Sequence, residues 1–223
     1  MRLAALISGG KDSLYSAYKA SKENEIACII SFKSKRADSY MFHIPNVHLV
    51  ELQAESMDIP LISAESSGIK EKELKDIKKA LQLAVKKYKI DGVVSGALAS
   101  NYQKERIDNI CKELKIESIA PLWHIEPKKY LNELIKNSFK AIIVGIAADG
   151  LTKDFLGKEI NADFIKKIEK LNIHGGGEGG EYESLVLDCP MFLKRLKINK
   201  SRIEMENKCT GKLIVENAEL IRK

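Results

Sequence analysis

The chain has few cysteines, and they lie far apart. Its 223 residues include four, at Cys28, Cys111, Cys189 and Cys209. Structural zinc sites and redox couples use closely spaced cysteines, so this spacing favours neither. Lone thiols of this kind are usually buried as small apolar side chains, and we expect no metal or redox role for them.

Long apolar runs are also missing. No stretch approaches the length of a membrane span, and the N-terminus lacks the pattern of a secretory signal peptide. These absences predict a cytoplasmic protein without a membrane partner.

A strong charge of one sign is absent as well. Lys and Arg number 37 and Asp and Glu number 31, which gives a net charge of +6. Such a mild excess is typical of solvated helix faces and argues against nucleic acid as the main partner. A basic stretch at residues 194–202 nevertheless keeps a tRNA-directed function open.

The first half of the chain alternates apolar runs with helical patterns. The apolar runs lie at residues 3–7, 26–32, 61–62, 93–94 and around Ile119, and the clearest amphipathic helix covers about residues 69–88. This alternation predicts a doubly wound α/β domain with a parallel sheet over residues 1–121.

The rhythm changes in the second half. Residues 131–135 predict a helix, 141–144 a buried strand and 164–171 a short helix, and short β-like segments follow from Leu185. We therefore predict a second, smaller α+β domain over residues 122–223. Its β-rich end could pair between two copies, which leaves a homodimer open.

Residues 8–13 read Ser-Gly-Gly-Lys-Asp-Ser and follow the first apolar run directly. A strand, a glycine turn and a helix N-terminus together make an anion site, because several backbone N–H groups and the helix dipole face one point. A carboxylate among phosphates needs a cation between them, so Asp12 is interpreted as a Mg²⁺ ligand. The alternative is that Asp12 and Ser13 only cap the helix.

This is not a Walker loop, because no second glycine precedes a Lys-Ser pair at the distance that such a loop needs. The pattern resembles the shorter motif of the ATP pyrophosphatases, which split ATP into AMP and pyrophosphate. This resemblance implies ATP and Mg²⁺ as cofactors, with Lys11 and Asp12 as catalytic residues and Asp12 as the metal ligand. The implied ATP-binding residues are Ser8, Gly9, Gly10, Lys11, Asp12, Ser13 and, in the second predicted strand, Ser31.

Residues 175–183 have the most unusual composition in the chain, Gly-Gly-Gly-Glu-Gly-Gly-Glu-Tyr-Glu. Glycine-rich linkers usually carry Ser and Pro, whereas this segment carries carboxylates and a tyrosine. We interpret it as an active-site loop whose carboxylates face a cation, and a surface linker is the alternative.

A predicted helix near residues 100–106 places Tyr102 and Arg106 on one face, four residues apart. It follows the strand that ends near Val94, so it is expected to overlook the crevice at the carboxyl edge of the sheet. Arg106 could then clamp a phosphate or carboxylate with two hydrogen bonds. The alternative is an exposed salt bridge.

Five segments together resemble the diphthine–ammonia ligases, also known as diphthamide synthases. They are residues 8–13, 38–41, 100–106, 177–183 and 187–190. Ser184 stands where that family commonly has Thr, which keeps the hydroxyl. Eukaryotic members carry further domains after this core, so the chain resembles the minimal archaeal form.

The resemblance implies ATP-dependent amidation of diphthine, a modified histidine of translation elongation factor 2 that bears a carboxylate and a trimethylammonium group. The carboxylate would become an acyl-adenylate with release of pyrophosphate, and ammonia would displace AMP to give diphthamide. Arg106 is implied as a catalytic residue. The implied substrate-binding residues are Tyr40, Tyr102, Gln103, Glu178, Gly180, Glu181, Tyr182 and Glu183.

Other functions stay open from the sequence. A tRNA-thiolating or lysidine-type enzyme would share the phosphate loop, although thiolating relatives often have paired cysteines. A small-molecule amide ligase and an ATP sensor without catalysis are further alternatives. Free ammonia is the expected nitrogen source, because no cysteine has a neighbouring histidine that would make it a glutaminase nucleophile.

Overall fold

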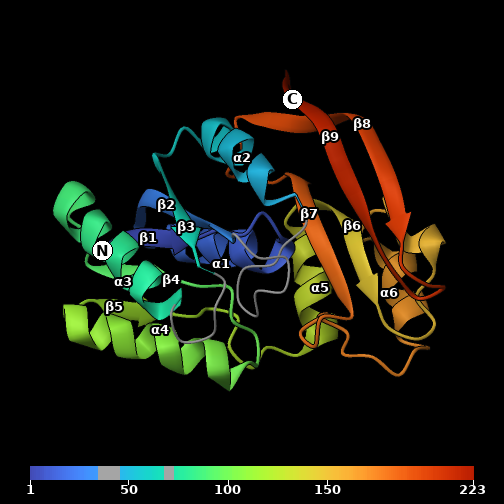
Figure 1. The fold of residues 1–223 in the computed structure, drawn as a ribbon, viewed down its shortest axis with the longest axis horizontal. Helices are drawn as coiled ribbons and strands as arrows, with labels where there is room; N and C mark the ends of the chain where they lie inside the picture. Colours follow the sequence, from blue (N-terminus) through green and yellow to red (C-terminus); the bar gives the residue numbers. More distant parts are fainter. Residues whose placement is uncertain (35–45, 68–72) are drawn as a thin grey trace.

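The computed structural model describes residues 1–34, 46–67 and 73–223, which form two β-sheets and their helices (Figure 1). The first sheet is parallel, with the strand order β3-β2-β1-β4-β5. Its strands are β1 (Arg2–Leu6), β2 (Glu25–Ser34), β3 (Leu61–Ser66), β4 (Gly92–Val94) and β5 (Glu117–Ile119). The prediction of a parallel α/β sheet is confirmed.

Helices cover both faces of this sheet. Alternate residues of β1 point to opposite faces, and because these residues are apolar on both faces, each face needs a covering layer. Leu3 and Ala5 join a core that includes Leu14 of the first helix, whereas Ala4 joins a second core that includes Ile77. The helices are α1 (Lys11–Ser21), α2 (Val50–Met57), α3 (Glu73–Tyr88) and α4 (Asn101–Leu114), with a 3₁₀ turn, η1, at Val47–Leu49. The doubly wound arrangement is therefore also confirmed.

The second sheet is antiparallel, with the order β7-β6-β9-β8. Its strands are β6 (Lys140–Ala147), β7 (Tyr182–Asp188), β8 (Lys194–Met205) and β9 (Thr210–Arg222). Helices α5 (Pro127–Lys136) and α6 (Ala162–Ile168) and the 3₁₀ turn η2 (Lys153–Phe155) accompany it. This is the smaller α+β unit that the sequence predicts.

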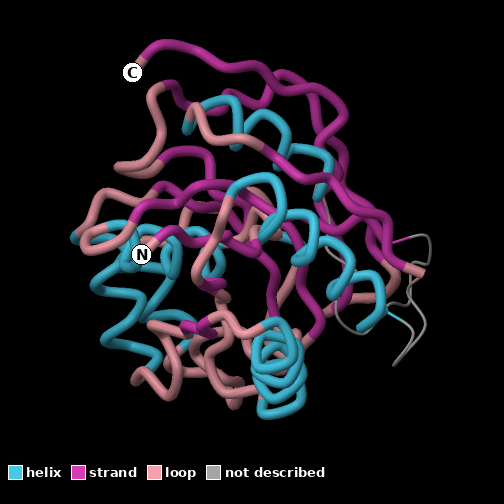
Figure 2. The backbone as a smooth tube through the Cα atoms, turned by 90° about the vertical axis from the view of Figure 1, so that its left-hand side faces the viewer, coloured by secondary structure: helices cyan, strands magenta, loops and turns pink. Residues whose placement is uncertain are grey.

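The expectation of short β segments near the C-terminus is wrong for β8 and β9. These strands are 12 and 13 residues long and form one hairpin, which runs across the top of the molecule in Figure 2. Many of their side chains are exposed, so polar residues inside the strands resemble turns in the sequence. Cross-strand ion pairs such as Arg202–Glu216 and Lys197–Glu219 suit such a solvated ladder.

One apolar core joins the two sheets. Leu14 and Tyr15 of α1 belong to the same buried cluster as Ile143 of β6 and Leu185 of β7. Strand β7 therefore lies against the helix that begins at the phosphate-loop motif (Figure 1). A division of the chain at residues 121 and 122 stays a prediction.

None of the helices in the described ranges is both long enough and apolar enough to cross a lipid bilayer.

Candidate active site

The predicted phosphate loop, residues 8–13, connects β1 to α1 as a tight turn. Gly9 has a φ of +92°, which glycine adopts without strain. The hydroxyls brace the turn, since the Ser8 N–H donates to Ser13 Oγ over 3.2 Å and Ser13 Oγ donates to the Gly10 carbonyl over 3.1 Å. Helix α1 begins at Lys11 with Gly10 as its N-cap and no side-chain capping bond. Neither Asp12 nor Ser13 caps the helix, so that alternative is wrong.

Gly96, which follows β4, lies against the first turn of α1. A Cβ atom at Gly96 would lie 2.6 Å from the Ser13 nitrogen and 2.8 Å from the Asp12 carbonyl carbon. Such contacts are with backbone atoms that cannot move aside, so only glycine fits here. In the sequence, a Ser-Gly pair after a buried strand is the one signal of this close approach.

Two residues outside the motif hold the phosphate loop in place. The Gln53 amide, which is fully buried, donates to the Gly9 carbonyl over 3.1 Å and to the Val186 carbonyl over 2.8 Å. Ser184 Oγ accepts from the Lys11 N–H over 3.1 Å. The family's Thr would offer the same acceptor, so the hydroxyl at Ser184 is what this contact needs.

The Lys11 side chain is 2% exposed and links the phosphate loop to the glycine-rich segment. Its Nζ donates to the Gly176 carbonyl over 2.7 Å and to Asp12 over 3.0 Å, and it lies 4.8 Å from the Tyr182 ring centroid. Burial lowers the pKa of Lys11, but Asp12, Tyr182 and Glu183 together outweigh it, so the pKa is raised above its usual value. These contacts favour the charged form of the buried Lys11 side chain.

Asp12 is held from one side and open on the other. Tyr130, which is fully buried in α5, donates its hydroxyl to Asp12 Oδ1 over 2.8 Å. The Asp12 side chain remains 32% exposed. Burial and the Asp12 charge raise the pKa of Tyr130 well above its ordinary value, so this hydroxyl keeps its proton. Nothing in the sequence around Tyr130 indicates that it contacts Asp12.

The Asp12 carboxylate fits a Mg²⁺ site of the kind that nucleotide phosphates complete. Within residues 1–34, 46–67 and 73–223, no three His, Cys, Asp or Glu residues gather closely enough to bind a metal by themselves. Mg²⁺ usually takes one or two carboxylates together with substrate phosphates and water. A single, partly exposed carboxylate beside a phosphate loop matches that pattern.

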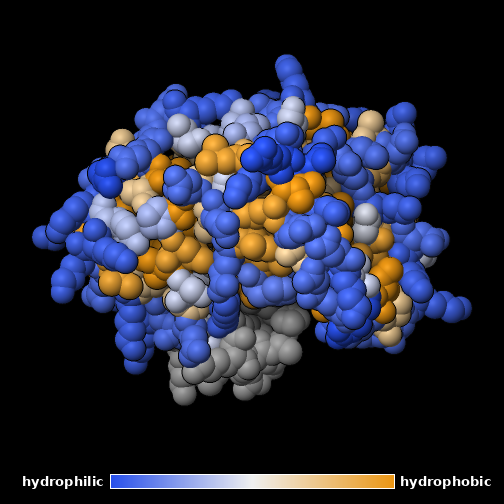
Figure 3. Space-filling model, turned by 90° about the horizontal axis from the view of Figure 1, so that it is seen from above, coloured by the Kyte–Doolittle hydropathy of each residue, from blue (hydrophilic) through white to orange (hydrophobic). Residues whose placement is uncertain are grey.

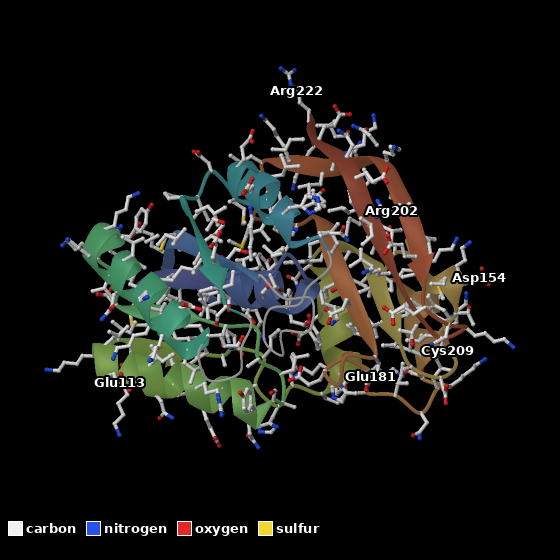
Figure 4. All side chains as sticks on the ribbon, viewed as in Figure 1. Glu113, Asp154, Glu181, Arg202, Cys209 and Arg222 are labelled. Carbon is white, nitrogen blue, oxygen red and sulfur yellow. The ribbon has the colours of Figure 1, made fainter. Side chains whose placement is uncertain are left out.

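The glycine loop, residues 174–183, is folded by its own carboxylates. Glu178 Oε1 accepts from the Ala99 N–H over 3.0 Å and from the Ser100 N–H over 2.7 Å, just before α4. Glu181, labelled below β7 in Figure 4, accepts from the His174 N–H over 2.9 Å and the Gly179 N–H over 2.8 Å. Two of the acidic residues thus satisfy backbone donors within the protein.

Tyr182 is part of the core of this loop. It is 2% exposed and donates its hydroxyl to the Gly175 carbonyl over 2.7 Å. Gly177 has a φ of +73°, and a Cβ there would lie 2.8 Å from the Tyr182 carbonyl oxygen. Gly180 has a φ of +83° and is exposed. Burial is the main reason that the pKa of Tyr182 rises to about 12, which keeps this hydroxyl neutral.

Glu183 is the acidic residue of the glycine loop that interacts electrostatically with the phosphate loop. It is partly buried, and burial, with a smaller contribution from Asp12, raises its pKa to about 7 against the opposing effect of Lys11. Its Cβ packs near Gly145 of β6, where a Cβ on the glycine would lie 3.0 Å away. Lys11, Asp12 and Glu183 therefore form one interacting charge group.

Tyr102 and Arg106 share a helix face, as the sequence predicts. The Arg106 Cζ atom lies 3.4 Å from the Tyr102 ring centroid, and Nη1 donates to the Tyr102 carbonyl over 3.2 Å. Ser31 is buried in β2 at 3% exposure, and its Oγ has no hydrogen-bond partner within the described ranges. Tyr40 and the Gln103 side chain lie outside the described residues.

The cysteines are buried thiols, apart from the partly exposed Cys209. Burial raises the pKa of Cys28 and Cys189 to about 12 and that of Cys111 to about 11. A thiol with such a pKa is not a thiolate nucleophile at neutral pH.

A parallel sheet covered by helices on both faces, with this glycine turn between β1 and α1, defines a doubly wound α/β protein. The chain belongs to the diphthamide synthase family. It matches the family models of the diphthamide synthase N-terminal domain over residues 1–118 and of the C-terminal domain over residues 126–221.

Similar proteins include the diphthine–ammonia ligases of Mus musculus and Homo sapiens. The mouse protein is 36% identical, over 93% of this chain and 86% of its own length, and the human protein is 34% identical, over 91% and 85%. The Saccharomyces cerevisiae ligase is 27% identical over 86% of this chain but only 33% of its own length. Eukaryotic members are expected to extend well beyond this core. The yeast relative does so, whereas the expectation is wrong for the mouse and human proteins.

Solved structures resemble the chain more distantly. A predicted subunit of a tRNA methyltransferase from Methanocaldococcus jannaschii has a TM-score of 0.42 at 15% identity, over 85% of this chain and 98% of its own. A U34-tRNA thiolase, NcsA, from Methanococcus maripaludis has a TM-score of 0.39 at 14% identity, over 81% and 70%. These scores are too low to support an inference about function.

Proposed function

We propose that the chain is an ATP-dependent ligase that amidates diphthine with ammonia, giving diphthamide, AMP and pyrophosphate. The observation that carries this proposal is the partly exposed Asp12 carboxylate, fixed by Tyr130 at a phosphate loop that Lys11 joins to the glycine loop. Relatives that match most of the chain are named diphthine–ammonia ligase, which supports the same activity.

The proposed adenylation step activates a carboxylate that would otherwise not react with ammonia. A carboxylate is a poor acyl donor because its oxygen is a poor leaving group. Attack of a carboxylate oxygen on the α-phosphorus of ATP would break the α–β bond, release pyrophosphate and leave an acyl-adenylate. Attack of ammonia on the acyl carbon would then expel AMP and lose a proton, leaving the amide.

The phosphate loop is proposed to hold the ATP phosphates through its backbone and the hydroxyls of Ser8 and Ser13, with Gly9 and Gly10 permitting close approach. Ser31, whose buried hydroxyl has no partner within the described ranges, is proposed to contact the nucleotide as well. Asp12 would hold Mg²⁺, which supplies positive charge where pyrophosphate departs. Lys11 would add a second positive charge near the departing pyrophosphate, held in place by its hydrogen bond to the Gly176 carbonyl of the glycine loop.

The substrate-binding proposals fall into two groups. Glu178 and Glu181 bind backbone N–H groups and Tyr182 is buried, so these residues, with Gly180, are proposed to shape the glycine loop around the substrate. Glu183, Tyr102, Gln103 and Tyr40 are proposed to contact it, and Arg106 to bind a carboxylate or phosphate.

The proposed protein substrate is translation elongation factor 2 bearing diphthine, and free ammonia is the proposed nitrogen donor. A cytoplasmic location would place the enzyme with that factor. An archaeal source stays a prediction from the sequence.

A homodimer stays a prediction. Exposed apolar surface is what such an interface would need: Leu193 is 68% exposed, and hydrophobic patches lie between the hydrophilic edges of the face seen in Figure 3.

The direct test is mass measurement of diphthine-bearing elongation factor 2 after incubation with the chain, ATP, Mg²⁺ and ammonium. We expect the factor to gain the mass change of amidation with ammonium and not with glutamine. An unmodified factor would contradict the proposal. In that case, salt-resistant binding of tRNA would favour the tRNA-modifying alternative.

A further inference from the structure

A cavity of about 220 Å³ lies next to the proposed catalytic residues. Its walls come from three segments: the residues after β4, the connection from β5 into α5, and the glycine loop. They are Leu98, Ala99, His124, Ile125, Glu126, Pro127, Tyr130, His174 and Gly176. The first two segments follow the carboxyl ends of neighbouring parallel strands, which is where ligands bind in such sheets.

Two hydrogen bonds connect this cavity to the phosphate loop. Tyr130, in its wall, donates to Asp12 over 2.8 Å, and the Gly176 carbonyl accepts from Lys11 over 2.7 Å. A group seated in the cavity would therefore lie one side chain away from the site proposed for the phosphates.

The walls suit a cation that makes no conventional hydrogen bonds. None of the described residues that line the cavity is Lys or Arg, and Glu126 contributes a carboxylate. Leu98, Ile125 and Pro127 supply apolar surface, and Tyr130 contributes an aromatic ring. His174 Nδ1 accepts from the Gly176 and Glu178 N–H groups, both over 3.3 Å, so this nitrogen is already used within the loop.

We infer that this cavity binds a quaternary ammonium group, the trimethylammonium of diphthine, an inference that rests on the proposed function. Such a group is held by carboxylates, apolar contacts and aromatic faces. Its positive charge matches Glu126, and its methyl groups match the apolar walls.

The size of the cavity favours this occupant over ammonia. A molecule of the size of water needs roughly 10–15 Å³ of such space. The cavity of about 220 Å³ is many times larger. Ammonia would leave most of it unfilled, whereas a trimethylammonium group with its alkyl chain fills more of it.

Binding to the full chain is tested by titration with tetramethylammonium, followed through the NMR ring signals of His124 and His174. Ammonium and the neutral, similarly shaped tert-butanol are titrated in parallel. We expect saturable shifts of both rings with tetramethylammonium, and binding at least about fivefold weaker for tert-butanol, because it lacks the charge. Equal binding of tert-butanol, no saturable shift, or saturation by ammonium alone would overturn the inference.

Two variants locate the site. The Glu126 carboxylate caps α5, accepting from the Lys128 N–H over 2.9 Å and the Lys129 N–H over 2.6 Å. Glu126→Gln keeps one of these acceptor oxygens but removes the charge, and it should weaken tetramethylammonium binding about fivefold. Glu159→Gln, which removes an exposed carboxylate paired with Lys140, is the matched control and should leave binding unchanged. Ala99→Phe places a ring in the cavity from an exposed position, so it should abolish binding without unfolding the chain.

The amidation assay separates this inference from the proposed function. If the chain amidates the factor, Ala99→Phe should raise the KM for the factor at least tenfold and leave the KM for ATP unchanged. An unchanged KM for the factor would overturn the cavity assignment while the ligase activity stands. If the wild-type chain binds tetramethylammonium in the cavity but does not amidate the factor, the cation site stands and the proposed function fails.

Discussion

The phosphate loop and the glycine loop meet at Lys11, but different interactions hold them. The phosphate loop is short and continues a buried strand directly into a helix. The glycine loop is long and irregular, and Glu178 and Glu181 fold it by accepting from backbone N–H groups. We therefore expect substitutions in the first loop to change the chemistry, and substitutions in the second to change stability and recognition of the substrate.

The largest effect is expected in the phosphate loop, from Asp12→Asn. The amide keeps an acceptor for the Tyr130 hydroxyl but loses the negative charge proposed to hold Mg²⁺. Turnover should fall by about 100-fold or more. Tm should fall as well, because the buried Lys11 cation loses the charge of its nearest carboxylate. Steady-state kinetics at saturating Mg²⁺ together with thermal unfolding measure both. Turnover within tenfold of wild type would show that Asp12 is not the metal ligand.

Glu178→Ala tests whether carboxylates hold the glycine loop. It leaves the Ala99 and Ser100 N–H groups without their side-chain acceptor. We expect a loss of about 2 kcal/mol in the free energy of unfolding. The KM for the protein substrate should rise while the KM for ATP changes little.

Glu178→Gln is the matched control, because it retains one acceptor oxygen and should lose less stability. Denaturant unfolding of both variants gives the comparison. Equal stability of Glu178→Ala and wild type would mean that the loop is held by other contacts.

Glu183→Gln examines the point where the two loops interact electrostatically. The folded protein raises the pKa of this carboxyl to about 7, so the folded state binds its proton more tightly than the unfolded state does. Stability should therefore fall as the pH rises from the ordinary carboxyl pKa through 7. The variant removes that penalty and should exceed wild type in stability by on the order of 1–2 kcal/mol at pH 8.

At about pH 4 wild type and Glu183→Gln should be nearly equal in stability, because this pH lies below the ordinary carboxyl pKa and the wild-type carboxyl is mostly protonated in both the folded and the unfolded state. Unfolding curves at both pH values decide the matter. A stability difference that does not depend on pH would contradict the raised pKa.

The smallest effect is expected for Arg106→Lys, on the helix that follows the glycine-loop contact at Ser100. Lysine cannot reproduce a two-pronged hydrogen bond or the stacking of the guanidinium on Tyr102. We expect a loss of about fivefold in kcat/KM. Activity equal to that of wild type would favour an exposed salt bridge at this position.

The fold and the phosphate loop were predictable because their signals are local. A short apolar run followed by two glycines and a helical pattern specifies a strand, a turn and a helix N-terminus in consecutive residues. The contacts that fix the loop are not local. Gln53 bonds carbonyls 44 and 133 residues away, and Tyr130 reaches Asp12 across 118 residues.

The glycine loop shows the other limit of the sequence. Its composition predicts a functional segment, but composition does not reveal what each carboxylate faces. Glu178 and Glu181 turned out to bind backbone N–H groups, whereas Glu183 lies in the field of Lys11 and Asp12. That distinction depends on how the loop folds back on itself, and Gly177 and Gly180, with their positive φ angles, allow it to do so.

The most direct test of the proposed activity is ³¹P NMR of the products formed from ATP by the chain with diphthine-bearing elongation factor 2 and ammonium. We expect AMP and pyrophosphate in equal amounts, formed only when the factor is present. ADP and inorganic phosphate as the products would contradict the assignment of residues 8–13 as an ATP pyrophosphatase loop.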